Sequence, residues 1–157
     1  MFKRGAVKDV IVKDLPRHLD DRGWLTELFR EDDIEAHYMP VMAYVSMTHA
    51  GVARGPHEHV DQSDSFAFIG PSDFKIFLWD NRKDSPTYMT RQIVYAGENS
   101  PRSIIIPPGV VHAYRNVGGK FGMVVNFPNR LYAGKDKKEP VDEIRHEADP
   151  KTIYILD

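Results

Sequence analysis

The chain has 157 residues, a formal net charge of −2 and no cysteine. This length suits one domain with a buried core, and the near-neutral charge gives no indication of a surface that binds nucleic acid. The lack of cysteine excludes disulfides, thiolate zinc sites and cysteine nucleophiles. We find neither a signal-peptide pattern nor the run of about 20 apolar residues that a membrane helix requires. We therefore expect a cytoplasmic protein without nucleic-acid or membrane partners.

Short segments rich in β-branched and aromatic residues alternate with turns containing Gly and Pro along most of the chain. The expected strands cover residues 10–15, 41–48, 65–69, 74–79, 88–95, 102–106, 121–127 and 152–156. Three segments are less regular: 24–29 is a strand or a helical turn, 31–37 a short helix or loop, and 140–147 a short helix. Turns at intervals of about ten residues are typical of a β-sandwich or barrel. No repeat or linker divides the chain, so we predict a single domain over residues 1–157.

The central strands carry features that we assign to packing and loop structure. Their aromatic residues are expected in the barrel core, namely Phe66, Phe68, Phe74, Phe77 and Trp79. Directly after them, Asp80 and Arg82 are expected to tie down the loop that leads to residues 85–87.

Two histidines one residue apart, His57 and His59, form the most informative pattern in the sequence. Residues i and i+2 of a strand point to the same face, so these imidazoles would lie side by side. Asp64 could reach the same surface from the next strand, and His112 follows a Pro-Pro-Gly turn. Three imidazoles and one carboxylate are suitable ligands for a divalent transition metal. Alternatively, the histidines are ordinary polar residues at a barrel mouth, and Gln62 competes with Asp64 as a ligand.

The spacing of these residues resembles the two sequence motifs of the cupin family. The first motif is matched by Gly51, His57, His59, Asp64 and Gly70, and the second by Pro107, Gly109, His112 and Asn116. Asp64 replaces the usual Glu, and one residue fewer than usual separates it from the closing glycine. The resemblance implies an all-β cupin double-stranded β-helix, or jelly-roll, barrel, to which we add a short C-terminal helical segment.

From about residue 10 to its end, the chain also resembles the dTDP-4-dehydrorhamnose 3,5-epimerase family of sugar-nucleotide cupins. The matching segments are 20–23 with Glu27, 53–57, 80–87, 106–112 and 149–150. The resemblance implies removal of a proton next to the C4 ketone of a nucleotide-linked sugar, then reprotonation on the opposite face. Such chemistry needs a base, a group that holds the enolate charge, and an acid. The family also implies a homodimer.

The same resemblance implies roles for individual residues. His57 matches the family's base, and Asp149 matches the carboxylate that fixes the orientation of its imidazole. Arg22, Glu27 and Arg54 match positions that contact the nucleotide-sugar, and the guanidinium group suits a bidentate grip on diphosphate.

The chain departs from the family pattern around the expected site. Residues 61–65 lack the family's Lys, and His59 stands where the family commonly has Gln. Asn126 replaces the catalytic Tyr, and the family's Gln-x-Asn becomes Met42-x-Tyr44. Asn126 is retained as a candidate substrate contact. The candidate proton donors are then Tyr114 and Tyr132.

The loss of Lys together with the gain of His59 and Asp64 is similar to an exchange of an ammonium group for a metal cation, which could polarise the ketone. A histidine bound to metal has no free lone pair, so His57 cannot be ligand and base in the same state. Either the four residues His57, His59, Asp64 and His112 bind a divalent metal, or His57 is the free base. Other classes also stay open: a metal-dependent isomerase or oxygenase, or a ligand-binding cupin without catalysis.

Overall fold

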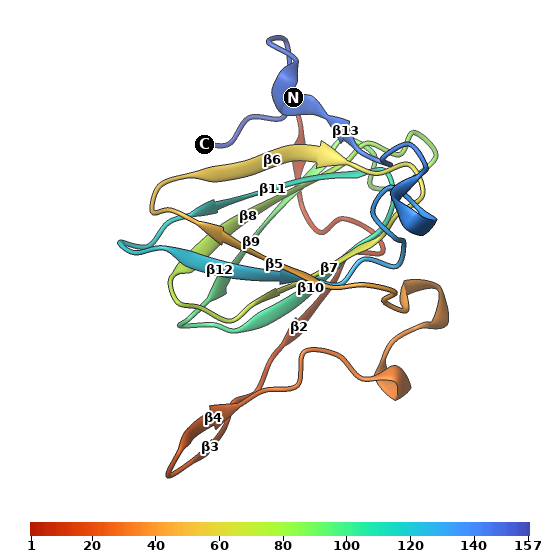
Figure 1. The fold of residues 1–157 in the computed structure, drawn as a ribbon. Helices are drawn as coiled ribbons and strands as arrows, with labels where there is room; N and C mark the ends of the chain where they lie inside the picture. Colours follow the sequence, from red (N-terminus) through yellow and green to blue (C-terminus); the bar gives the residue numbers. More distant parts are fainter.

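The computed structural model describes residues 1–157, and most of its strands form two facing β-sheets (Figure 1). The six-stranded sheet has the order β1-β9-β8-β11-β6-β13, and the five-stranded sheet has the order β2-β10-β7-β12-β5. The strand bounds are β1 Lys3–Arg4, β2 Ile11–Asp14, β3 His18–Asp20, β4 Gly23–Leu25, β5 Tyr44–Thr48, β6 Ala53–Glu58, β7 Asp64–Phe68, β8 Asp73–Asp80, β9 Thr90–Gly97, β10 Arg102–Ile106, β11 Val110–Asn116, β12 Gly122–Asn126 and β13 Ile144–Arg145. The hairpin of β3 and β4 belongs to neither sheet and projects away from both (Figure 1). The predicted all-β jelly-roll class is confirmed.

Helical structure is limited to four short 3₁₀ segments: η1 Glu31–Asp33, η2 Ala36–Tyr38, η3 Lys135–Lys137 and η4 His146–Ala148. None approaches the length and hydrophobicity of a helix that could cross a membrane. The helix predicted over residues 140–147 is wrong in extent, because β13 pairs with β6 there and only η4 is helical. The strand predicted over 152–156 is also wrong, since these residues belong to no sheet. The C-terminal segment is instead attached to β6, through Arg145 opposite His57.

The alternation of side chains along β8 divides the aromatic residues between two clusters. Phe74 lies between the two sheets with Phe66 and Phe68, as part of a buried cluster of 13 residues. Phe77 and Trp79 are also buried, but they belong to a second cluster with Tyr154. The assignment of all five aromatic residues to one barrel core is therefore wrong for Phe77 and Trp79. Residues i and i+2 share a face, so these two point to the other side of the sheet, where the C-terminal segment covers them.

The loop after β8 is organised by Asp80, whose side chain is completely buried. Its carboxylate accepts hydrogen bonds from Arg82 Nε at 2.8 Å, Ser85 Oγ at 2.6 Å and Thr87 Oγ1 at 2.5 Å. Burial alone would raise the pKa of Asp80, but these hydrogen bonds outweigh it and lower the pKa to about 2. The predicted role of Asp80 and Arg82 in tying down this loop is confirmed.

Candidate active site

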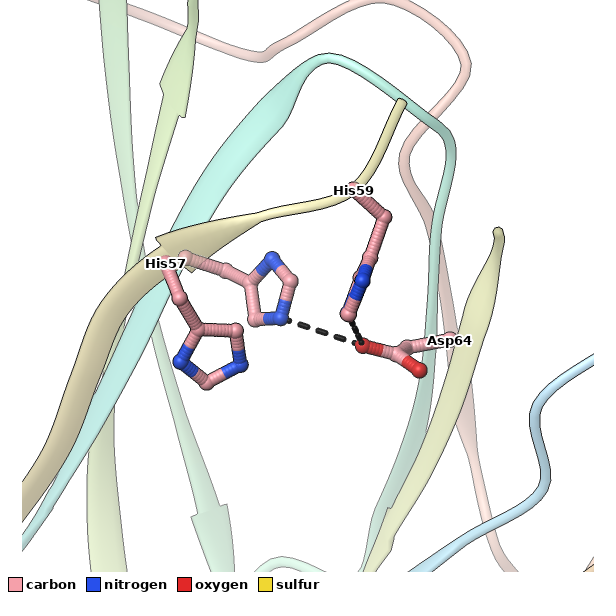
Figure 2. A group of neighbouring side chains, drawn as sticks. His57, His59 and Asp64 are labelled. Carbon is pink, nitrogen blue, oxygen red and sulfur yellow. Dashed lines mark hydrogen bonds and ion pairs between the residues drawn. The ribbon is translucent and has the colours of Figure 1, made fainter. Parts of the chain in front are cut away.

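Three histidines and one aspartate converge between the sheets at one end of the barrel. His57 lies on β6 directly opposite His112 on β11, and His59 follows the last residue of β6. Asp64 begins β7 on the facing sheet. Figure 2 shows His57 and His59 on the same side of their strand, with Asp64 facing them. One possible ligand atom from each of the four residues lies within 4.8 Å of the others, so the predicted convergence is confirmed.

Backbone carbonyl groups fix how two of these imidazoles are oriented. Nδ1 of His112 is 3.0 Å from the carbonyl oxygen of Val110, and Nδ1 of His59 bonds the carbonyl of Asp142. A carbonyl can only accept, so each Nδ1 carries the donated proton. Both Nε2 atoms then face the same carboxylate oxygen, Oδ2 of Asp64, at 3.0 Å for His59 and 3.1 Å for His112.

This arrangement brings hydrogen-bond acceptors together. In the neutral tautomer that the carbonyls select, Nε2 is an acceptor, and the ionised carboxylate is one as well. Nε2 of His112 is buried and has no hydrogen-bond partner. Burial alone would lower the pKa of His59, but the hydrogen bond and charge of Asp64 raise it to about 9. The point where the three groups meet therefore attracts a positive charge, either a proton or a metal cation.

The other oxygen of Asp64 is held by two amide side chains. Oδ1 accepts from Gln62 Nε2 and from Asn126 Nδ2, each at 2.9 Å. The same Asn126 Nδ2 is 2.9 Å from the hydroxyl oxygen of Tyr44. Asn126 is completely buried, so it supports Asp64 from behind rather than lining the open site.

Asp142 fixes the turn that follows His59. Its carboxylate accepts the backbone N–H groups of Val60, Asp61 and Gln62 at 2.8, 2.9 and 2.8 Å. Because its carbonyl also bonds the His59 ring, this single residue of the C-terminal segment sets the position of a site histidine. No local pattern in the sequence indicates such a contact over 83 positions.

His57 differs from its neighbours because neither of its ring nitrogens takes part in a hydrogen bond within the chain. Burial lowers the pKa of His57 to about 2, so the imidazole is neutral. The backbone is close on one side: a Cβ atom at Gly55, whose φ is +80°, would come within 2.6 Å of the His112 carbonyl oxygen and 3.1 Å of His57 Nδ1. Position 55 therefore requires glycine, and this glycine lies beside His57, whose imidazole has a free lone pair.

Two hollows open beside His57. One has a volume of about 830 Å³ and contains His59, Gln62 and Tyr132 in its wall, and the other, of about 460 Å³, contains Arg54 and Tyr114. They share four lining residues, which are Tyr44, His57, Glu143 and Arg145. These volumes suit a small organic ligand. Five cationic side chains line the two hollows, namely Arg54, Arg130, Lys135, Lys137 and Arg145. Four carboxylates line the same hollows, namely Glu139, Asp142, Glu143 and Glu147.

The structure places three of the residues expected at the site away from it, namely Asp149, Arg22 and Glu27. Asp149 is exposed, and its carboxylate accepts the backbone N–H of Lys151 at 2.8 Å instead of pairing with His57. The physical reason is the adjacent turn η4, where His146 bonds the buried Glu58 and leaves Asp149 facing outward.

The expected contacts Arg22 and Glu27 are also absent from the walls of both hollows. Arg22 pairs with Asp20 at the tip of the β3–β4 hairpin, and Glu27 pairs with Arg30 at 3.3 Å. By contrast, Arg54 lines the smaller hollow, as expected for a substrate contact, and donates to Thr48 Oγ1 at 3.0 Å.

The fold and this site define a cupin whose histidines and carboxylate lie at the mouth of the barrel. A family model described as dTDP-4-dehydrorhamnose 3,5-epimerase matches residues 4–139, and the chain belongs to this family. It is accordingly an enzyme of the sugar-nucleotide epimerase type.

Two curated relatives and one solved structure are similar over most of the chain. A probable low-salt glycan biosynthesis epimerase, Agl13 of Haloferax volcanii, is 33% identical over 85% of this chain and 85% of the relative. The spore coat polysaccharide biosynthesis protein SpsL of Bacillus subtilis is 32% identical over 94% and 93%. A dTDP sugar isomerase structure from Desulfovibrio desulfuricans has a TM-score of 0.77 at 19% identity, covering 88% of this chain and 84% of that one, which bears on the fold alone.

Proposed function

We propose that the enzyme epimerises a nucleotide-linked 4-keto-6-deoxy sugar, with His57 as the base that removes a proton next to the C4 ketone. The observation that carries this proposal is the position of His57, whose imidazole has no hydrogen bond within the chain and borders both hollows. A base with a free lone pair in a ligand-sized hollow is what abstraction from a carbon acid requires. The names of the two relatives support a product that enters a glycan or polysaccharide.

The cationic side chains of the two hollows suit the nucleotide portion of such a substrate. A diphosphate carries negative charge that arginine binds in bidentate fashion and lysine binds as a point charge. Arg130, Lys135 and Lys137 in the larger hollow and Arg54 in the smaller one can supply this attraction. We therefore place the diphosphate among these cations and the sugar beside His57.

We also propose that His59, Asp64 and His112 hold a divalent metal cation. The fit rests on the buried Nε2 of His112, which lacks a partner, and on two imidazole nitrogens that face one carboxylate oxygen. A cation bound there would act as a Lewis acid toward the ketone oxygen. His57 is near enough to be the fourth ligand of the predicted site. We assign it the role of base because, unlike His59 and His112, it has no carbonyl that fixes its ring.

We also propose that the protein is a homodimer, and we expect the β3–β4 hairpin to form the interface between the two copies. Leu19 and Leu25 on this hairpin are 80% and 63% exposed, and Trp24 beside them is also exposed. Apolar side chains on a projecting element favour burial against another protein surface. A second copy of the chain would also explain the positions of Arg22 and Glu27, because the hairpin holds Arg22 and the segment directly after it holds Glu27, and both could reach the partner's site.

We expect replacement of both Leu19 and Trp24 by Ser to convert a dimer into a monomer, because these two side chains are paired across the hairpin and share one of its faces. Light scattering after size-exclusion chromatography measures the change. The control is Ile155→Ser, which alters an exposed apolar residue outside the hairpin. A wild-type monomer, or a double variant that remains dimeric, would contradict this interface.

The function itself is tested by incubating the protein with 4-keto-6-deoxy sugars linked to dTDP, UDP, GDP and CDP. We expect NMR spectra of the recovered sugar to reveal inversion at C3, at C5 or at both for one of these nucleotides. No inversion with any of them, from protein loaded with divalent metal and from metal-free protein, would refute the proposed reaction.

A further inference from the structure

Inversion of a carbon centre requires a proton donor on the face of the sugar opposite to the base. Three tyrosines line the hollows beside His57, and they differ in their positions. Tyr114 lies on β11, next to β6 in the same sheet as His57. Tyr132 follows β12 outside any strand and is 56% exposed. Tyr44 lies on β5 of the facing sheet and lines both hollows, so a sugar between the sheets would meet His57 and Tyr44 from opposite sides.

The hydrogen bonds around Asn126 determine which way the hydroxyl group of Tyr44 can donate. The amide oxygen of Asn126 accepts the backbone N–H of Ser65 at 3.2 Å, which places its NH₂ group on the other side. The two protons of that NH₂ group go to Asp64 Oδ1 and to the Tyr44 oxygen, each at 2.9 Å. The Tyr44 oxygen therefore accepts a hydrogen bond, and its own proton remains available for a ligand.

The environment of Tyr44 suits a group that starts protonated. Tyr44 as a whole residue is 46% exposed, but partial burial of its hydroxyl group outweighs the opposite effect of the Asn126 hydrogen bond and raises the pKa to about 12. The phenol therefore keeps its proton at neutral pH. Once the proton has left, the Asn126 N–H would stabilise the phenolate oxygen, since charge-assisted hydrogen bonds are the stronger kind.

Tyr44 and Asn126 are also two of the positions at which this chain departs from the family pattern. Tyr44 and Asn126 are direct partners across the β5–β12 ladder. The resemblance places an amide at position 44 and a tyrosine at position 126, and this chain has the two side chains exchanged. The exchange leaves one tyrosine and one asparagine on the same wall of the barrel, with the phenol now supplied by β5.

We propose that Tyr44 is the proton donor of the epimerisation, held ready by Asn126. This inference rests on the proposed function. His57 takes the proton from the carbon next to the ketone, which gives an imidazolium and an enolate. Tyr44 then gives its O–H proton to the opposite face of that carbon and becomes a phenolate. The imidazolium returns its proton to the phenolate through solvent, so the protein ends the cycle unchanged.

Tyr44→Phe separates removal of the proton from its return on the opposite face. In heavy water, we expect this variant to incorporate deuterium at the same carbons as the wild type, within a few-fold in rate. His57 can return a solvent-exchanged deuteron to the face it came from. Inversion should fall by about 100-fold or more, the size of a general-acid contribution. NMR of the recovered sugar reports both quantities, and thermal unfolding shows whether the variant is folded.

The control variant is Tyr95→Phe, which changes an exposed tyrosine on β9 away from both hollows. The variants Tyr114→Phe and Tyr132→Phe test the two other tyrosines of the hollows as donors. Inversion by Tyr44→Phe at the wild-type rate would overturn the inference, as would a loss of inversion confined to Tyr114→Phe or Tyr132→Phe. If the wild type neither exchanges nor inverts, the proposed function itself has failed. Exchange without inversion in Tyr44→Phe, with both intact in Tyr95→Phe, supports Tyr44 as the donor.

Discussion

Replacement of His57 by Asn is expected to lower the rate of epimerisation by about 1,000-fold, within the range for loss of a general base. Asn has a similar polarity and fits the space, but its amide cannot take up a proton at neutral pH. His57 forms no hydrogen bond within the chain, so its replacement leaves no buried partner without a bond. The loss should appear as a lower kcat with little change in the unfolding temperature.

The matched control for this variant is His49→Asn, an exposed histidine in the loop between β5 and β6. It removes an imidazole from the same region without altering either hollow. We expect wild-type kinetics from it. Equal rates for His57→Asn and His49→Asn would remove His57 from the chemistry and require another base.

Replacement of Asp64 by Ala is expected to have the largest effect on metal content and on stability. The carboxylate is nearly inaccessible, and it bonds His59, Gln62 and Asn126. Its removal leaves buried polar groups without partners, which typically costs about 3–5 kcal/mol of unfolding free energy when a buried charged group is lost. We also expect the bound metal to fall from nearly one equivalent to less than a tenth.

Urea unfolding of metal-free protein measures the stability, and elemental analysis of protein purified without chelator measures the metal. The two readouts are independent of activity. Asp61→Ala is the control, because Asp61 is an exposed carboxylate three residues away whose ion pair with Arg130 is 3.8 Å long. If wild-type protein binds no divalent metal under any loading condition, the positive charge at this site is a proton, and the proposed metal is wrong.

The central part of the site could be predicted from the sequence because its signals are local. Alternation along a strand placed His57 and His59 on one face, and the motif spacing placed Asp64 and His112 beside them. The strand-rich fold followed from the same kind of information, since β-branched and aromatic runs between turns leave few other structures.

The parts that could not be predicted depend on contacts between distant segments. Asp142 bonds the turn after His59 from a C-terminal segment that reads as a short helix, and nothing near it in the sequence indicates this contact. The proposed role of Tyr44 as proton donor can be recognised only once β5 is known to pair with β12, where Tyr44 lies opposite Asn126. The predicted pairing of Asp149 with His57 is wrong, because a resemblance indicates the residue type but not the local path of the chain, and η4 turns Asp149 outward.

The most direct test of the account is the incorporation of deuterium by the wild-type enzyme from heavy water into a nucleotide-linked 4-keto-6-deoxy sugar. An enolate beside the C4 ketone must form whenever His57 removes a proton. We predict deuterium at C3, at C5 or at both, at no other carbon, and at a rate that falls in the His57→Asn variant. Absence of deuterium with every nucleotide tested, or an equal rate of incorporation in His57→Asn, would contradict this prediction.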